Sequence, residues 1–433
     1  MFGSFVSALS GLKAAGAAID VIGNDLANLN TDGFKSSTLS FQDVVANVSG
    51  AANRQIGSGV ASPLIFKNFT QGAIQTTGGT NNAAIQGDGF FVVRPAVIGS
   101  AAAPAPDLTN DLFTRAGNFQ VDKNGFLVSA TGERVQGWSL NTATGQVSPS
   151  DPIGDIIVPV GSNRAAKPTT TFNADLNLDA SATAGAPFSV PVNVYDSLGN
   201  SHVITANFTK DATANSWDAT VSSADPAVTL TGNGPFTFTF NTDGSLQTVT
   251  GSDPTTGDIT GIQMAITGGA QSPQNLSWSP WQTPPVGTTA GVGRVTQFAE
   301  ASAASSISQD GLPAAQLTSV SITDGGVVLA DYSNGSQQQV AQLALVSIRN
   351  PDSLVSTGNN NFRTGESSAI PVVGQAGTGG RGSIVGGSLE SSNVDMATEF
   401  TQLIIFQRSY SANARVITTT DQISQETINL IHP

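Results

Sequence analysis

The chain has 433 residues, of which 39% are hydrophobic and only 11% are charged, so it carries enough apolar surface for several folded cores. Its formal net charge of −14 disfavours nucleic acid and anionic membranes as partners. Cysteine is absent, which excludes disulfides, cysteine-ligated zinc and thiol nucleophiles.

The first predicted element is a long helix over residues 2–29. Apolar or small residues recur there at intervals of three and four, which is the spacing of a heptad seam. Asn30-Thr31-Asp32-Gly33 closes this helix, because glycine readily takes the left-handed conformation that helix ends favour. The large apolar residues of the predicted seam are Phe5, Leu9, Leu12, Ile19 and Leu26.

Short strands are predicted after this helix. A stretch rich in Gly, Ser, Ala and Asn runs to Ser62, and its scattered apolar residues predict no element. Strand-like runs then occupy residues 72–93 and 113–138, and the second region contains turn signals at Lys123-Asn124-Gly125 and Ala130-Thr131-Gly132-Glu133. This alternation indicates an antiparallel β region.

From about residue 151 to residue 285 the composition shifts towards Thr, Val, Asn and Asp. Apolar residues alternate with period two in residues 188–194, 204–208 and 236–240, which predicts the strands of a compact antiparallel β domain, a sandwich or a barrel. The run from Pro280 to Pro285 is predicted to be its exit linker.

Strands resume over residues 318–348, and a Gly-rich loop is predicted over residues 374–387. A second helix closes the chain after the cap-like run Ser391–Asp395. Its apolar stripe contains Leu403, Phe406, Tyr410 and Ile417. Two seamed helices at opposite ends of a chain can meet only if the middle returns to its starting point, so we interpret the middle as insertions carried on a terminal helical pair.

The predicted fold is therefore mainly β with terminal α-helices, in which a coiled-coil-like inner domain carries nested β domains. The helical core domain with its linkers takes residues 1–71 and 374–433. The inner β domain takes residues 72–150 and 286–373, and the outer β sandwich or barrel takes residues 151–285.

Enzymatic chemistry finds little support. His202 falls within a predicted strand, where a strand-face histidine is a better interpretation than a general base. Most acidic residues stand in turns, which Asp favours for backbone reasons. The glycines of residues 374–387 lack the Lys-Ser/Thr ending of a phosphate loop, and no uninterrupted apolar run approaches the ~20 residues of a membrane span. We predict no catalytic, cofactor-binding or metal-ligating residue and no cofactor.

Two interpretations of the apolar stripes stay open. The stripes can form the core of an intramolecular helical hairpin, or they can pack between subunits. Small residues such as Gly16 and Gly23 cover much of the first helix, which suits close packing against several neighbours. Asn24, Asn28 and Asn30 can hydrogen-bond backbone groups where that helix ends.

Four segments, residues 10–35, 70–93, 113–119 and 389–413, together resemble the bacterial flagellar axial family of rod and hook proteins. Within that family the hook branch is the nearest resemblance, because residues 194–202 resemble its outer β domain and residues 332–335 and 346–360 its inner one. The family motif in the first segment contains Asn24, Asn28, Asn30, Thr31, Gly33, Phe34 and Lys35.

The resemblance implies a structural subunit of the flagellar hook, which self-assembles into a curved helical tube and joins rod to filament as a flexible universal joint. The implied partners are further copies of the chain, the rod and hook–filament junction proteins, the hook cap and the flagellar export apparatus. Neither nucleic acid binding nor membrane insertion is expected. The implied location is extracellular, reached by type III export, which fits an N-terminus without the features of an ordinary signal peptide.

Two alternatives are a distal rod protein of the same family and, from another class, a secreted β-rich adhesin or glycan-binding module. The adhesin would use Trp138, Trp217, Trp278 and Trp281 as sugar-stacking faces, although buried core is the better interpretation of these residues. The resemblance also points to the segment from Phe41 to Phe69, which looks longer than in compact hook proteins and which distinguishes stiff rod from bendable hook in the family.

Overall fold

A computed structural model describes residues 2–45, 57–95, 111–141, 146–161, 163–283 and 291–431. The chain divides into two compact units. The first comprises Met1–Val160, Thr318–Asp331 and Gln337–Pro433, and the second comprises Gly161–Leu317 and Tyr332–Ser336. Strands dominate both units, and the helices lie near the chain ends, which confirms the predicted fold class.

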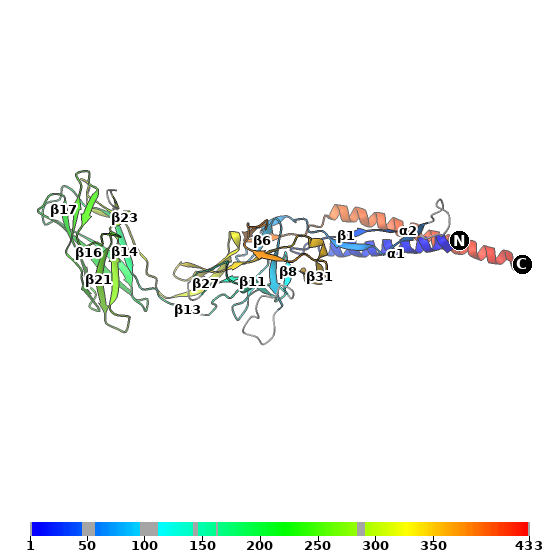
Figure 1. The fold of residues 1–433 in the computed structure, drawn as a ribbon, viewed down its shortest axis with the longest axis horizontal. Helices are drawn as coiled ribbons and strands as arrows, with labels where there is room; N and C mark the ends of the chain where they lie inside the picture. The colour runs from blue at the N-terminus through cyan, green and yellow to red at the C-terminus, as the bar shows by residue number, and fades with distance from the viewer. Residues whose placement is uncertain are drawn as a thin grey trace. The chain divides into compact units, whose positions relative to one another are not determined.

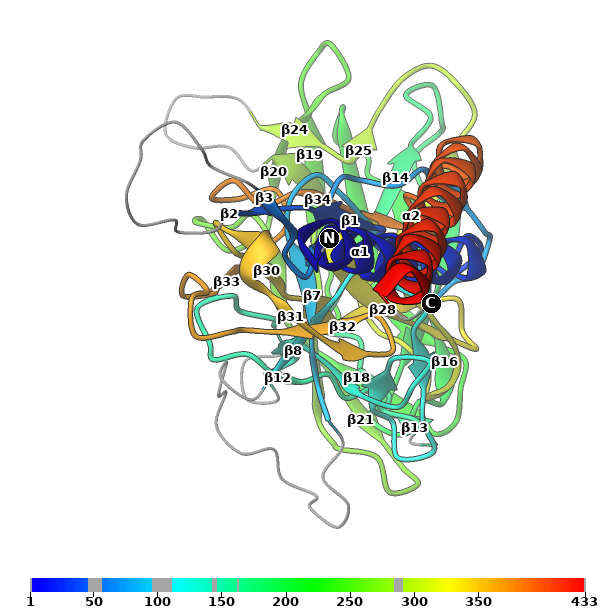
Figure 2. The same cartoon turned by 90° about the vertical axis from the view of Figure 1, so that its right-hand side faces the viewer.

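The two helices, α1 (Phe2–Ala27) and α2 (Met396–Ile431), lie side by side as an antiparallel pair in the first unit (Figures 1 and 2). A β hairpin follows α1, in the stretch for which the sequence predicts no element. Strand β1 pairs with β4 and β2 pairs with β3, and β3 lies against α1. The strands of this hairpin are β1 (Ser37–Ser40), β2 (Asp43–Val45), β3 (Gly57–Val60) and β4 (Leu64–Lys67).

A large, mostly antiparallel sheet forms the β part of the first unit, with the strand order β27-β28-β29-β11-β7-β8-β32-β31. Its core packs aromatic rings such as Phe90, Phe113 and Phe362 against aliphatic side chains. The strands predicted over residues 72–93 and 113–138 are confirmed as β5 to β11. The bounds are β5 (Ile74–Thr76), β6 (Ala83–Gln86), β7 (Phe90–Arg94), β8 (Leu112–Thr114), β9 (Gln120–Val121), β10 (Leu127–Val128), β11 (Arg134–Ser139), β12 (Gly154–Asp155), β27 (Ala315–Ile322), β28 (Val327–Tyr332), β29 (Gln337–Leu343), β30 (Leu345–Ser347), β31 (Val355–Gly358), β32 (Asn361–Arg363), β33 (Val372–Gly374), β34 (Ser383–Gly386) and β35 (Ser388–Glu390), with short 3-10 helices at Asp324–Gly326 and Pro351–Ser353.

The Gly-rich stretch 374–387, predicted as a loop, is partly strand, and that prediction was wrong. Strand β33 ends at Gly374, and β34 pairs antiparallel with β6. The glycines allow close backbone approach: a Cβ built on Gly386 would lie 2.2 Å from the carbonyl oxygen of Ile322. Glycine that serves packing has the same sequence signature as glycine that serves flexibility.

The second unit is a β sandwich, as the alternation of apolar residues indicates. One sheet has the order β15-β16-β17-β19-β20, and the other has the order β18-β21-β22-β14-β25 with β26 also paired to β14. The bounds are β13 (Asn163–Arg164), β14 (Thr171–Asn177), β15 (Pro187–Tyr195), β16 (Ser201–Lys210), β17 (Ser216–Ser223), β18 (Val228–Thr231), β19 (Phe236–Phe240), β20 (Leu246–Val249), β21 (Ile259–Ile266), β22 (Gln274–Trp278), β23 (Trp281–Thr283), β24 (Val292–Gly293), β25 (Val295–Thr296) and β26 (Ala303–Gln309).

The proline run predicted as an exit linker does not end the sandwich. Trp281–Thr283 forms β23, which pairs with β24, and the later strand β26 pairs with β14. Pro280 precedes this short strand, whose tryptophan is buried, and Pro284 and Pro285 lie outside the described residues.

The tryptophans are core residues. Trp217 and Trp278 are among the largest fully buried side chains of the second unit, and Trp281 and, in the first unit, Trp138 are also buried. Trp278 stacks on Phe172 with ring centroids 5.7 Å apart and meets the Phe208 ring edge-on at the same distance. These rings offer no stacking face to a sugar, so the observation that suggested a glycan-binding module is removed.

His202 lies on β16, as predicted, and is buried. Its Nδ1 lies 2.6 Å from a carboxylate oxygen of Asp225, and its Nε2 lies 3.4 Å from one of Asp196. The ring thus bridges two loops of the sandwich, which is a structural role.

Candidate assembly interface

The intramolecular contact between the helices uses the small face of α1. Ala8, Ala15 and Ile22 lie one heptad apart and are buried. A Cβ built on Gly11 would lie 2.9 Å from Nδ2 of Asn413, so a larger residue there would require the Asn413 side chain to shift. Gly11 and Gly16 thus face α2, whereas Gly23 is exposed and a Cβ built on it would meet nothing within 4 Å.

The residues of the predicted seam are only partly covered in the single chain. On α1, Leu9, Leu12, Ile19 and Leu26 are half-buried and Phe5 is 37% exposed. On α2, Leu403, Phe406 and Ile417 are half-buried and Tyr410 is 41% exposed. The structure thus places the predicted residues on the two paired helices and leaves part of their surface uncovered.

Further apolar side chains extend this uncovered surface. They come from both helices and from the hairpin strand β4, and a concentration of exposed apolar residues on one module is typical of an interaction surface. The helix from Gly3 to Ala27 also has the length and the mean hydropathy, 1.5, of a membrane-spanning segment, a test that core helices pass as well. The additional exposed residues are Val6, Leu64, Ile65, Phe66, Phe400, Ile404 and Ile405.

Asparagines of the family motif make hydrogen bonds at the C-terminal end of α1. Asn28 donates from Nδ2 to the carbonyl of Asn24 at 2.9 Å, and its Oδ1 accepts from the hydroxyl of Thr31 at 3.1 Å. Phe34 is buried beneath the ammonium of Lys67, which lies 4.7 Å from the ring centroid. Asn30 is exposed.

Gly33 is the point where the end of α1 meets the β part. Its φ of +69° is left-handed, as the sequence predicts. A Cβ there would lie 2.5 Å from the backbone nitrogen of Ala116, so no other residue fits without displacing backbone. Its N–H donates to the carbonyl of Glu390 at 2.7 Å.

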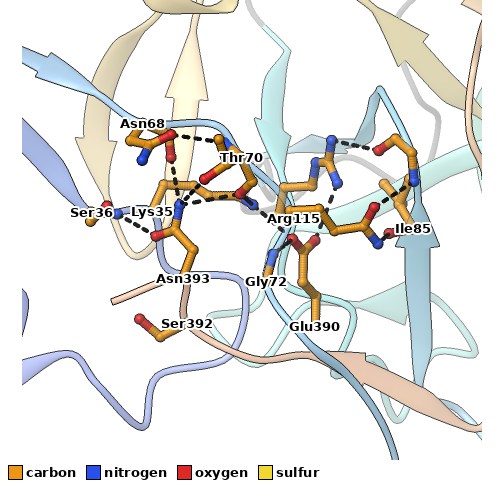
Figure 3. Close-up of polar contacts among 12 residues, drawn as sticks. Lys35, Ser36, Asn68, Thr70, Gly72, Ile85, Arg115, Glu390, Ser392 and Asn393 are labelled. Atoms are coloured by element: carbon orange, nitrogen blue, oxygen red, sulfur yellow. Dashed lines mark hydrogen bonds and ion pairs between the residues drawn. The ribbon is translucent and has the colours of Figure 1, made fainter. Parts of the chain in front are cut away.

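Glu390 is the centre of a buried cluster of three charged residues, the Lys35–Glu390–Arg115 cluster (Figure 3). Glu390 Oε1 accepts from Lys35 Nζ at 2.7 Å and from the backbone N–H of Gly72 at 2.9 Å, and Oε2 accepts from Arg115 Nη1 at 3.2 Å. Lys35 also donates to the carbonyl of Thr70 at 2.7 Å. Because Lys35 follows α1, Arg115 follows β8 and Glu390 ends β35, the cluster fixes the helical pair to the β part of the first unit.

The electrostatics of this cluster depend on its single carboxylate. Burial lowers the pKa of the Lys35 ammonium, and the Glu390 carboxylate opposes that shift. Arg115 also donates from Nη2 to the carbonyl of Gly87 at 2.9 Å. The cluster holds two cations and one anion, so removal of Glu390 would leave both cations buried without a counter-charge.

Asn393 makes a second connection to the start of α2. Its Oδ1 accepts from the backbone N–H of Ser36 at 2.7 Å, and its Nδ2 donates to the carbonyl of Asn68 at 2.8 Å. Asp395 then caps α2 by accepting from the N–H of Thr398 at 3.0 Å, which confirms the predicted cap.

Sequence reasoning did not single out Glu390, Arg115 or Asn393. All three stand in segments that resemble the axial family.

Asp25 is a fully buried carboxylate near the end of α1. Its Oδ2 accepts from the backbone N–H of Ser37 at 2.7 Å, whereas Oδ1 has no hydrogen-bond partner within the described ranges. Burial raises the pKa of Asp25, and hydrogen bonding and the nearby Lys67 oppose that shift. Burial, Asp25 and Asp395 also raise the pKa of Glu399.

These shifts predict that acid stabilises the helical pair. An acid whose folded-state pKa is raised destabilises the fold when ionised, and this cost disappears as pH falls through the folded-state pKa. We expect the helical melting temperature to rise as pH falls from 7 towards the ordinary carboxyl pKa of about 4, and to rise less in Asp25→Asn, which keeps the bond to Ser37. Circular dichroism melts at 222 nm measure this, and an equal rise in both proteins would contradict it.

The candidate interface is suited to packing against another protein surface. Within the described ranges, no three His, Cys, Asp or Glu residues are grouped so as to hold a metal ion. The side chains of the predicted seam are apolar, and the buried charges of the Lys35–Glu390–Arg115 cluster are engaged with one another. Such a surface can bind another protein surface.

Comparisons with known proteins agree with this geometry and define a class. Models of flagellar families match along the chain: "Flagella basal body rod protein" at residues 6–35, "Flagellar hook protein FlgE/F/G D1 domain" at 84–170, "Flagellar basal body protein FlaE D2 domain" at 160–312 and "Flagellar basal body rod FlgEFG protein C-terminal" at 385–430. The fold and its terminal helical pair are thus those of an axial protein of the bacterial flagellum.

Whole-chain relatives narrow the class. The chain is 33% identical to the flagellar hook protein FlgE of Borreliella burgdorferi over 99% of this chain and 100% of that protein. It is 32% identical to the corresponding protein of Salmonella typhimurium with the same coverage. A crystal structure of Helicobacter pylori flagellar hook protein FlgE2 shares the fold, with a TM-score of 0.50 and 14% identity over 72% of this chain and 99% of that one. The chain belongs to the flagellar hook protein family and is a structural subunit of the hook.

Proposed function

We propose that copies of this chain polymerise through the edge of the helical pair, so that the half-buried seam residues become the intersubunit core. The observation that carries this proposal is the apolar surface that the pair leaves uncovered, from Phe5 on α1 to Ile404 and Ile405 on α2. Its burial between copies would contribute about 25 cal/mol per Å². Low charge over the chain suits side-by-side packing of identical subunits.

The location, the export route and the protein partners of the chain are proposed from this role in a polymer. We propose an extracellular polymer exported by the flagellar apparatus, with rod and hook–filament junction proteins at its ends and a cap protein during growth. We also propose that the chain catalyses no reaction. Its place in a structural family supports this, and so do the structural roles of His202 and of the buried charges.

We propose three working parts. The terminal residues 1–71 and 374–433 would form the assembly core. The β part of the first unit, which includes residues 72–150, would support it through the Lys35–Glu390–Arg115 cluster. The second unit, Gly161–Leu317, would be an outer module inserted into the β part.

The direct test is polymerisation of the purified chain. Light scattering should rise above a critical concentration, and negative-stain electron microscopy of the same samples should show tubes. A chain that stays monomeric at all concentrations, under conditions that polymerise a relative's subunit, would contradict the proposal.

The outer module should be dispensable for assembly but not for tube shape. Asn163 pairs with Gln316 and Arg164 with Ala315, so the segment 161–317 begins and ends on adjacent strands. We expect a deletion that joins Val160 to Thr318 through an Asn-Gly turn to leave the helical pair intact and to yield tubes of changed curvature. Electron microscopy distinguishes the outcomes: absence of tubes would contradict the first claim, and unchanged curvature the second.

A further inference from the structure

The last turns of α2 extend beyond the start of α1. Gly11 faces Asn413 and Gly16 faces Tyr410. Because the helices are antiparallel, the numbers of any two residues that face each other add up to about 425, which gives the partner of every other position. The beginning of α1, Phe2, therefore faces about Ile423, and the remaining eight residues of α2, at 1.5 Å each, extend about 12 Å beyond it. Figure 1 shows this red end of α2 running on past the N-terminus.

The overhang is defined as the C-terminal end of α2, residues 421–431, in which Ile423 is 52% exposed. Val416, one heptad earlier on the same face of α2, is 41% exposed. Glu426 lies one turn after Ile423 and is exposed, without an ion-pair partner among the described residues. Asp421, by contrast, accepts a hydrogen bond from Gln425.

A groove at the side of α1 offers complementary chemistry. It has a volume of about 490 Å³ and lies between α1 and the hairpin, with walls that include Val6, Leu9 and Ala17 from α1 and Val60, Pro63 and Ile65 from the hairpin. Val6 and Ile65 are both at least half exposed. Lys13 also lines it, is exposed, and has no ion-pair partner among the described residues.

We propose that the overhang of one copy docks in the α1–hairpin groove of another copy. Ile423 fills the apolar groove, and Glu426 pairs with Lys13. The overhang cannot reach the groove of its own chain. Lys13 faces about position 412 of its own α2, and Glu426 lies some fourteen residues, or about 21 Å, farther along that helix. Docking is therefore heterologous and adds copies in a row. This inference rests on the proposed polymerisation and names the surfaces that would join.

Cysteine cross-linking tests the contact, because the chain has no cysteine of its own. The variant Ala17→Cys with Ile423→Cys should give a ladder of disulfide-linked multimers when its polymer is oxidised. Ala17 faces about position 408 of its own α2, which is about 22 Å from Ile423, so a link within one chain is excluded. The matched control is Ala17→Cys with Gln425→Cys, which places the second thiol on another side of α2 and should give no more than a fifth of the multimer.

A charge exchange tests the ion pair independently. Lys13→Glu and Glu426→Lys should each raise the critical concentration for polymerisation about three- to tenfold, and the double variant should return it to within about twofold of the parent. Circular dichroism of each monomer checks that the helices are retained.

The possible outcomes distinguish failure of this docking contact from failure of the proposed polymerisation. A parent chain that does not polymerise would overturn the proposed function and this docking with it. A parent that polymerises, with no cross-linked ladder above the control and no recovery in the double charge variant, would overturn the docking alone. A ladder together with recovery supports it.

Discussion

Replacement of Leu12 or Ile417 by aspartate is expected to abolish polymerisation. Both residues are half-buried at the edge of the helical pair, and a second copy would complete their burial. An unpaired carboxylate there would cost several kcal/mol, and every subunit in the polymer would repeat that cost. The critical concentration should rise more than a hundredfold, which sedimentation measures directly.

The controls for this prediction lie on the same helices. Gln402→Asp places the same charge on an exposed polar position of α2 and should assemble with a critical concentration within a few fold of the parent's. The strand signal of the aspartate monomers should melt near the parent's temperature, because the β cores contain no residue of the helical seam. Normal polymerisation of Leu12→Asp would show that the seam is not the intersubunit core, and early melting of the β signal would show that it is intramolecular core.

Substitution of Glu390 by glutamine should be the most damaging single change to the stability of the first unit. It leaves Lys35 and Arg115 buried without a carboxylate, and breaking such a buried pair typically costs about 3–5 kcal/mol in the free energy of unfolding. Urea titration followed by far-ultraviolet circular dichroism measures that change. Because the cluster holds the helical pair on the β part, assembly should weaken in parallel.

The matched control is an exposed ion pair in the other unit. Lys167 and Asp310 lie 3.1 Å apart with side chains 55% and 33% exposed, so Lys167→Ala should cost less than about 1 kcal/mol. A Glu390→Gln variant that is no less stable than Lys167→Ala would show that the buried cluster does not hold the unit together.

Much of the architecture was predictable because local patterns carried it. The period-two alternation of Phe188 to Val194 and of Phe236 to Phe240 follows directly from one buried sheet face. The helix ends were equally local, since Gly33 adopts a left-handed backbone and Asp395 caps α2.

The parts that depend on distant partners could not be predicted. The heptad pattern predicted the apolar stripe of α1 but not which residues of α2 it faces, such as Asn413 opposite Gly11 and Tyr410 opposite Gly16. Glu390 lies 355 residues from Lys35 along the chain, and no local pattern joins them. The strand at Ser383–Gly386 was hidden in the same way, since its glycine, Gly386, is explained only by the backbone of Ile322 that it approaches.

The central claim is that the terminal helical pair is the intersubunit core of the polymer. The measurement that tests it most directly is an electron cryomicroscopy reconstruction of tubes grown from the purified chain. The account predicts that Leu12, Ile404 and Ile417 of each subunit lie within about 4.5 Å of apolar atoms of a neighbouring subunit. Tubes in which these side chains face solvent, while the subunits meet only through their β parts, would contradict it.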